Sequence, residues 1–157
     1  MSESATMGDD ANRWVTFRLE SETYGINVMQ VQEVLRVSEI APVPGAADYV
    51  IGIINLRGNV VTVVDTRRRF GMVEKEVDDL SRIIIIETEE QVVGILVDSV
   101  AEVVEIPASE IETAPNVGTE ESAKYILGVT SRENELLILV DLNKFLSEEE
   151  WNEVGQF

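Results

Sequence analysis

Short apolar runs separated by polar residues fill most of the chain, which is the pattern of β-strands. Val15, Phe17 and Leu19 alternate with polar residues, as expected for a strand with one buried face. Four consecutive isoleucines, residues 83–86, predict a strand that is covered on both faces. The other strands are expected at residues 24–28, 50–54, 60–64, 92–97, 125–129 and 136–140.

Turns and a few helical segments interrupt these strands. Valines recur at a spacing of three over residues 28–34, which predicts a helical turn or two. Residues 40–45 include two prolines and are therefore expected to form an extended loop. Gly58-Asn59 is a favourable pair for a hairpin turn. Ser-Glu-Glu-Glu at 147–150 is a capping box that should open a helix.

The strand pattern occurs twice. Gly25-Ile-Asn-Val28 recurs as Gly94-Ile-Leu-Val97, 69 residues later (94 − 25). Tyr49-Val-Ile-Gly52 recurs as Tyr125-Ile-Leu-Gly128, 76 residues later (125 − 49). Each copy holds roughly five strands, which suits a small SH3-like barrel. Because a barrel of that size is only marginally stable alone, the two copies should pack against each other.

The predicted fold is therefore all-β, with two SH3-like five-stranded β-barrels packed together and short helices, including one at the C-terminus. Residues 1–13 are acidic and lack periodicity, so they are expected to form a disordered N-terminal arm. The first barrel repeat is placed at 14–81 and the second at 82–146. A C-terminal helix is placed at 147–157, and residues 14–150 form one domain overall.

Composition narrows the possible partners. The chain has 157 residues and a net charge of −18, which disfavours nucleic acid and anionic membrane surfaces, although acidity also serves solubility alone. It contains no Cys and no His, so disulfides, zinc clusters and thiol nucleophiles are excluded and no cofactor is expected. No apolar run approaches the ~20 residues of a membrane span. The N-terminus lacks the pattern of a signal peptide, so a cytoplasmic protein without direct membrane insertion is expected.

An enzymatic function finds little support. The common nucleotide-binding, metalloprotease and serine-hydrolase motifs are absent. Asp65 and Asp141 could form a carboxylate pair in a hydrolase, which remains a remote alternative. Each of them ends an apolar strand at the same place in its copy, so capping of the following turn is the favoured interpretation.

The two copies differ most clearly at one hairpin, where the first has Asn55-Leu-Arg-Gly58 and the second has Ser131-Arg-Glu-Asn134. The guanidinium of Arg57 could bind a carboxylate or a carbonyl group of a partner. The alternative, slightly favoured from the residues alone, is an internal pair with Glu33 or Asp48.

Two further sets of residues are candidates for binding a partner. Residues 67–69, Arg-Arg-Arg, could bind an acidic partner, but a solvated helix end is the favoured interpretation. Val31 and Val34 are equivalent to Val100 and Val103 in the other copy. Most of these valines should belong to the core, and facing sets would line an apolar groove suited to an amphipathic helix.

Several motifs together resemble the CheW-like family of bacterial chemotaxis coupling proteins. They are Phe17-x-Leu19, Tyr24-Gly25-Ile26, Val31-Gln-Glu33-Val34, Gly52-x-x-Asn55-Leu56-Arg57-Gly58, Val64-Asp65-x-Arg67, Val93-Gly94-x-x-Val97-Asp98 and Tyr125-x-x-Gly128. The likeness runs from about Trp14 to Leu146, and the Asn-Leu-Arg-Gly hairpin is its most specific part. The fold also occurs in the histidine kinase CheA and in CheV, but a stand-alone coupling protein is the closer match.

The resemblance implies a non-enzymatic adaptor, monomeric on its own, that couples chemoreceptors to CheA in membrane-associated signalling arrays. A coupling protein of a non-flagellar pathway, such as surface sensing or motility, would have the same surfaces and stays open.

The resemblance also implies binding residues. The cytoplasmic hairpin tip of the chemoreceptor would bind a groove between the barrels. The matching positions are Val31, Glu33, Gly52, Arg57, Gly94, Val100 and Val103. The CheA regulatory domain would contact a loop with Glu112, Asn116 and Val117. This loop departs from the best-known pattern, in which an arginine precedes it and an acidic–aromatic pair closes it.

Overall fold

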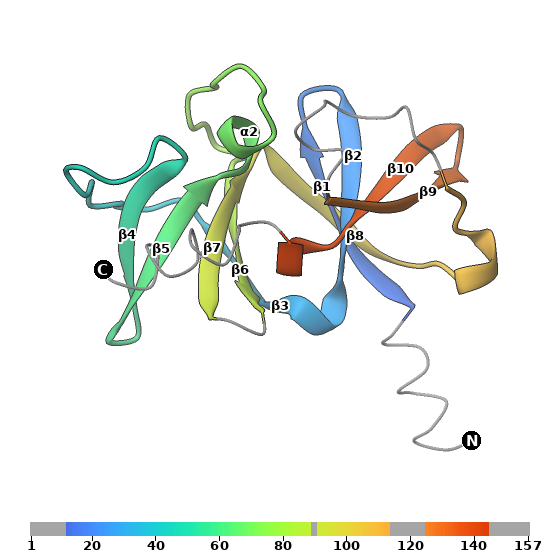
Figure 1. Ribbon diagram of the computed structural model, residues 1–157, viewed down its shortest axis with the longest axis horizontal. Helices are drawn as coiled ribbons and strands as arrows, with labels where there is room; N and C mark the ends of the chain where they lie inside the picture. The colour runs from blue at the N-terminus through green and yellow to red at the C-terminus, as the bar shows by residue number, and fades with distance from the viewer. Residues whose placement is uncertain (1–11, 89–90, 114–124, 145–157) are drawn as a thin grey trace.

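The structure, a computed structural model, describes residues 12–88, 91–113 and 125–144, and these form two five-stranded sheets (Figure 1). The first sheet has the strand order β8-β1-β2-β10-β9. Its strands are β1 (Arg13–Leu19), β2 (Glu22–Asn27), β8 (Ser99–Glu105), β9 (Ile126–Arg132) and β10 (Glu135–Val140).

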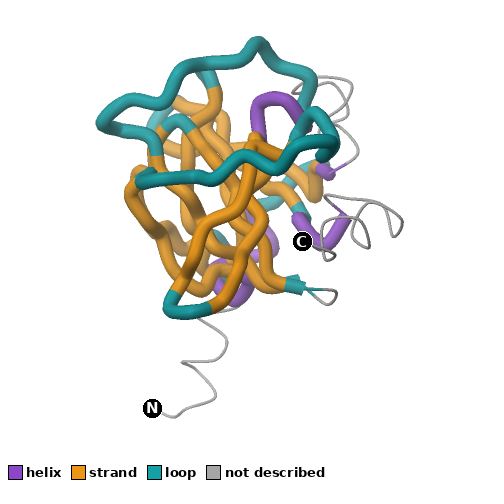
Figure 2. The backbone as a smooth tube through the Cα atoms, turned by 90° about the vertical axis from the view of Figure 1, so that its left-hand side faces the viewer, coloured by secondary structure: helices purple, strands orange, loops and turns teal. Residues whose placement is uncertain are grey.

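The second sheet has the strand order β3-β6-β7-β5-β4. Its strands are β3 (Val31–Arg36), β4 (Val50–Leu56), β5 (Asn59–Asp65), β6 (Arg82–Glu87) and β7 (Val92–Val97). Each sheet curls into an SH3-like barrel, and Figure 2 faces the barrel built from β3–β7. The predicted all-β fold of two such barrels is confirmed.

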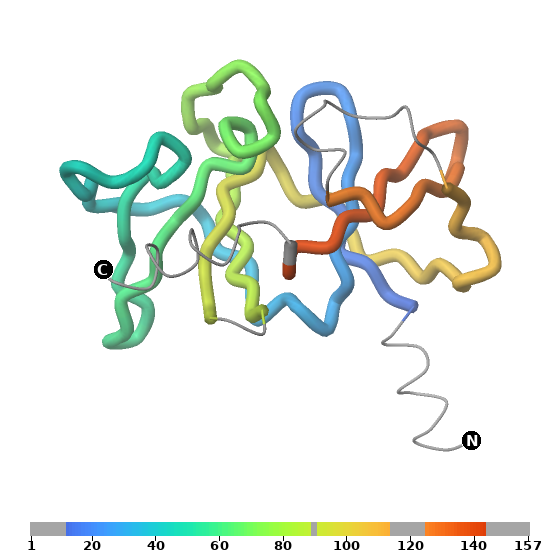
Figure 3. The backbone as a smooth tube through the Cα atoms, viewed as in Figure 1, coloured from blue at the N-terminus to red at the C-terminus, as the bar shows by residue number. Residues whose placement is uncertain are grey.

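The two sequence copies are interleaved in the barrels. The first copy comprises β1–β5 and the second β6–β10, but the first sheet combines β1 and β2 with β8, β9 and β10. Figure 3 shows this directly, because the blue N-terminal strands lie beside the orange and red C-terminal ones. The predicted division at 14–81 and 82–146 therefore does not coincide with the sheets. The apolar pattern identifies strands but contains no information about which copy supplies the neighbour.

Parallel strand pairs join the copies. β10 pairs with β2 and β5 pairs with β7, each in parallel, whereas the other pairs among the described strands are antiparallel. Parallel neighbours require a long crossover connection, so they cannot come from a simple hairpin. Neither copy can complete a sheet by itself.

Three apolar clusters fill the molecule. The largest lies between the sheets and includes the stacked rings of Phe17 and Tyr24. Two smaller clusters fill the barrels, one around Trp14 and one around Ile54. The isoleucines of β6 alternate between two of these clusters, since Ile84 and Ile86 face the central one and Ile83 and Ile85 the second barrel. The prediction of a strand covered on both faces is confirmed.

The described helices are short: η1 (Val28–Gln30), α2 (Thr66–Arg69), η2 (Ala108–Glu110) and η4 (Leu142–Lys144). None of the helices in this part of the chain is long and apolar enough to cross a membrane. The helical turn predicted over residues 28–34 is limited to η1, because β-branched valines favour the strand that follows. The arm at 1–13 lies largely outside the described residues, and Arg13 already begins β1. The predicted helix at 147–157 lies outside them entirely.

Candidate partner-binding site

The β4–β5 hairpin ends in a two-residue turn, Arg57-Gly58, one residue earlier than the predicted Gly58-Asn59 pair. Arg57 has φ 52° and Gly58 has φ 88°, the left-handed conformations of a type I′ turn. Asn55 stabilises the turn, because its Oδ1 accepts a hydrogen bond from the Gly58 amide at 2.9 Å. The Asn-Leu-Arg-Gly segment therefore holds an arginine at the hairpin tip.

A β-bulge directs Glu33 toward this tip. The β3–β6 ladder shifts register between Val31 and Glu33, so that Gln32 is an extra residue on β3. Bulges change the direction of the side chains around them. The carboxylate of Glu33 here reaches the guanidinium group of Arg57.

Glu33 and Arg57 form a two-pronged ion pair. Nη1 of Arg57 donates to Oε1 of Glu33 at 3.2 Å, and Nη2 donates to Oε2. The hydrogen bonds from Arg57 lower the pKa of Glu33, and the same bonds raise the pKa of Arg57. The favoured expectation of an internal pair with Glu33 is met. Since the Arg57 side chain is still 68% exposed, this pair is also accessible to a partner.

The predicted groove valines differ in their exposure. Val31 and Val100 are half-buried and pack against the cluster between the sheets. Val103 is 54% exposed and Val34 is 39% exposed. All four lie on β3 or β8, which are edge strands of their sheets. The apolar set thus divides into two residues that support the core and two that face solvent.

Gly52 and Gly94 act through close packing. A Cβ atom on Gly52 would overlap the carbonyl group of Ala41, whose backbone bridges to Ile53 and closes the second barrel. A Cβ atom on Gly94 would lie 2.9 Å from Cγ2 of Ile83, inside the same barrel. At both of these predicted groove positions, a side chain would therefore point into the barrel.

The predicted kinase-contact loop begins at a fixed point. Glu112 forms two backbone hydrogen bonds with Val129, of 2.8 and 2.7 Å, which close the first barrel as Ala41 closes the second. The other two predicted residues, Asn116 and Val117, lie outside the described residues.

Arg67 is not solvated, in contrast to the favoured interpretation of the arginine cluster. Its side chain is 12% exposed and donates from Nε and Nη2 to Asp98, at 2.8 and 2.5 Å. Asp98 also accepts from the Glu20 amide at 2.8 Å. Burial alone would raise the pKa of Asp98, but these hydrogen bonds outweigh it and lower the pKa. The sequence contains both residues in separate motifs, without a signal that they meet.

The other two arginines of the cluster are also engaged. Nη1 of Arg68 donates to the Asp48 carbonyl group at 2.7 Å, and Nη2 pairs with Glu74. The guanidinium carbon of Arg69 lies 5.1 Å from the ring centroid of Tyr49, a cation–π contact. The cluster serves the internal structure, which weakens its candidacy as an acid-binding surface.

Asp65 and Asp141 cap turns at the ends of strands in different sheets. Asp65 accepts from the Arg67 amide at 3.0 Å, and Asp141 accepts from the Asn143 amide at 2.9 Å. Burial is the main cause that raises the pKa of Asp65. Within the described segments, no group of three or more acidic residues is arranged to hold a metal ion. The capping role that the repeat predicted accounts for both carboxylates.

Comparison with known proteins identifies the family. The family model described as CheW-like domain matches residues 13–150. The chain is 36% identical to chemotaxis protein CheW of Bacillus subtilis, covering 87% of this chain and 88% of that protein. It is 32% identical to CheW of Treponema pallidum, covering 92% and 87%. The crystal structure of scaffolding protein TtCheW from Thermoanaerobacter tengcongensis superimposes with a TM-score of 0.79 at 31% identity, covering 89% of this chain and 90% of that one. The chain belongs to the CheW-like family of chemotaxis scaffold proteins.

Proposed function

We propose that this protein is a non-enzymatic adaptor that couples chemoreceptors to the histidine kinase CheA in membrane-associated arrays. Membership of the CheW-like family over residues 13–150 supports the pathway. The observation that carries the adaptor role is the accessible Glu33–Arg57 pair at the most specific motif of the chain. Its position at a hairpin tip suits contact with another protein.

The receptor contact is proposed for the edge strands β3 and β8. Val103 would provide apolar contact, because 54% of it is exposed. Val31 and Val100 would support the floor of the surface from the central cluster. A hairpin tip of two helices presents apolar side chains on one face, which is the shape that such a surface accepts.

A pull-down with a chemoreceptor cytoplasmic fragment tests this site. Val103→Asp should weaken binding at least about tenfold, because an exposed apolar contact would be replaced by a charge that must lose water. Val77→Asp is a matched control, since Val77 is 51% exposed in the loop before β6 and should leave binding unchanged. Equal receptor binding by both variants and the parent protein would exclude Val103 from the interface.

The kinase contact is proposed for the loop that leaves Glu112, together with Asn116 and Val117. The Glu112–Val129 backbone bridge supports this proposal by anchoring the start of that loop. Co-purification with the CheA regulatory domain tests it, with Asn116→Asp as the variant. Unchanged recovery of the kinase domain would move the contact to another surface.

A further inference from the structure

The repeat allows the Glu33–Arg57 pair to be compared with its counterpart in the first barrel. Adding 69 to Glu33 gives Glu102 on β8, and adding 76 to Arg57 gives Glu133 at the β9–β10 tip. The backbone is similar at both places. The β1–β8 ladder shifts register next to Glu102, and Glu133 has φ 51°, close to the 52° of Arg57.

The chemistry is opposite. In the second barrel, the Glu33 carboxylate forms an ion pair with the Arg57 guanidinium group. In the first barrel, two carboxylates occupy the equivalent positions, and two ionised carboxylates do not pair. Among the described contacts, no ion pair joins a cation to Glu102 or Glu133 as Arg57 is joined to Glu33, although Arg132 also lines this place.

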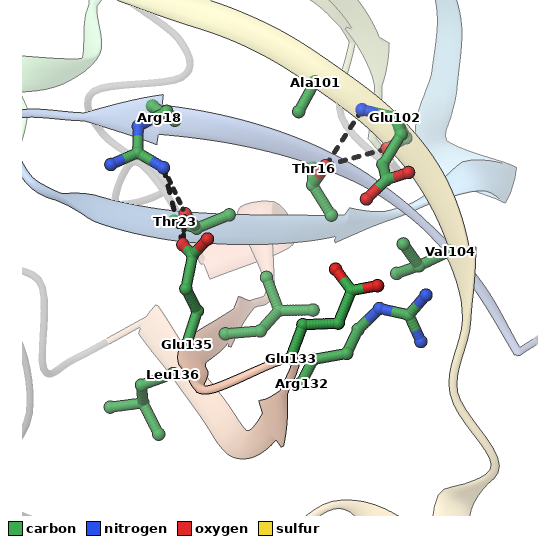
Figure 4. Close-up of a pocket in the computed structure, with 11 residues that line it drawn as sticks. Thr16, Arg18, Thr23, Ala101, Glu102, Val104, Arg132, Glu133, Glu135 and Leu136 are labelled. Carbon is green, nitrogen blue, oxygen red and sulfur yellow. Dashed lines mark hydrogen bonds and ion pairs between the residues drawn. The ribbon is translucent and has the colours of Figure 1, made fainter.

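A cavity of about 90 Å³ lies at this place. Figure 4 shows Glu102 and Glu133 extending into the same space, one from β8 and the other from the hairpin. A water needs about 10–15 Å³ on this measure, so the cavity has room for a planar head group. Its lining residues are Thr16, Arg18, Thr23, Ala101, Glu102, Val104, Arg132, Glu133, Glu135, Leu136 and Leu137.

Hydrogen bonds hold several of the residues that form the walls of the cavity. The hydroxyl of Thr16 donates to the Glu102 carbonyl group at 2.8 Å and accepts from the Glu102 amide at 3.0 Å, which fixes the bulge. Arg18 is held by the Thr23 hydroxyl at 3.2 Å and by Glu135 at 3.5 Å. Three lining carboxylates and two lining guanidinium groups leave one negative charge (3 − 2), within a chain of net charge −18.

We propose that this cavity binds an arginine side chain of a partner protein, with the guanidinium group between Glu102 and Glu133. The side chain of Val104 would contact its methylene groups. A guanidinium group fits better than an ammonium group, because its planar fork can reach both carboxylates. The inference rests on the internal comparison with Arg57 and does not depend on the chemotaxis role.

The test is an NMR titration of the full chain with the peptide acetyl-Gly-Arg-Gly-amide. Shifts are expected at the amides of Thr16, Ala101 and Glu102, with weaker binding as salt is raised. Glu102→Gln and Glu133→Gln should each weaken binding about fivefold, the upper range for an exposed ion pair. The same peptide with lysine should bind more weakly, and the one with citrulline should not bind.

A second variant separates binding from general charge. Glu133→Arg restores the pairing seen in the second barrel, so it should fill the cavity and abolish peptide binding. Glu110→Arg changes the net charge equally at η2 and should leave binding intact. The proposal is overturned if the arginine and citrulline peptides bind alike, if shifts appear away from the cavity, or if Glu133→Arg binds as the parent does. Receptor pull-down with Glu133→Arg should remain normal, which keeps this test separate from the proposed adaptor role.

Discussion

Removing the Asp98 carboxylate tests how strongly the two barrels are tied together, because this side chain binds groups from both. It accepts from Arg67 at the end of the second sheet and from the Glu20 amide in the β1–β2 turn of the first. The Arg67 and Asp98 side chains are only 12% and 16% exposed, so solvent screens their interaction weakly. Figure 1 places α2 next to the β1–β2 turn.

The expected loss of stability depends on which interactions remain after the Asp98 carboxylate is removed. A hydrogen bond to a charged group contributes about 1.5–3 kcal/mol, and Asp98 accepts several that are not additive. Arg67 keeps its bond to the Val73 carbonyl group at 2.9 Å, which limits the loss. We expect Asp98→Ala to lower the free energy of unfolding by about 2–3 kcal/mol, and the melting temperature by roughly 5–10 °C.

A double-mutant cycle isolates the pair. Urea unfolding of Arg67→Ala, Asp98→Ala and the double variant should give a coupling energy of about 1–2 kcal/mol. The control cycle uses Arg18 and Glu135, which are 42% and 63% exposed at 3.5 Å and should couple by less than about 0.5 kcal/mol. Coupling of the two pairs to the same small extent would refute the view that Asp98 joins the barrels.

Two other predictions concern pH and packing. Since the pKa of Asp98 is lowered, its stabilisation is complete above the ordinary pKa and is lost as the pH falls through the folded value. Between pH 5 and about 3, urea unfolding should therefore show a smaller loss of stability for Asp98→Asn than for the parent protein. Gly52→Ala should lower the free energy of unfolding by about 2 kcal/mol or more, because the added methyl group displaces Ala41. Gly45→Ala should cost only about 1 kcal/mol, because Gly45 has φ 82° but open space around it. Thermal unfolding that ranks the two variants in the reverse order would contradict the packing argument.

Local patterns were good guides to single strands and turns. The burial of 83–86 on both faces followed from four consecutive isoleucines, and the caps at Asp65 and Asp141 followed from their equal places in the two copies. These features depend on a residue and its near neighbours in sequence. The extent of the helical turn after Val28 was harder to predict, because valine spacing fits a strand with a bulge as well as a helix.

Contacts between distant segments were harder to predict. The partner of Arg57 stayed open between Glu33 and Asp48, and the partner of Arg67 was not anticipated. A charged side chain has several possible partners at similar sequence distance, and only the folded backbone selects one. The role of Gly52 depended likewise on Ala41, which the loop brings back to β4.

By itself, the sequence determined the order of eight of the ten described strands, all except β3 and β8. It also determined the existence of two equivalent units and the hairpin that carries Arg57. These are local or repetitive properties. The spacing of apolar residues and the residues that favour turns encode them directly. Only the tertiary structure decided that the units exchange strands, that Glu33 holds Arg57, and that the equivalent place in the other barrel is an open cavity between two carboxylates. The physical reason is that parallel strand pairs and ion pairs join residues far apart in the chain. Their contributions to the free energy of folding arise only once both barrels have formed.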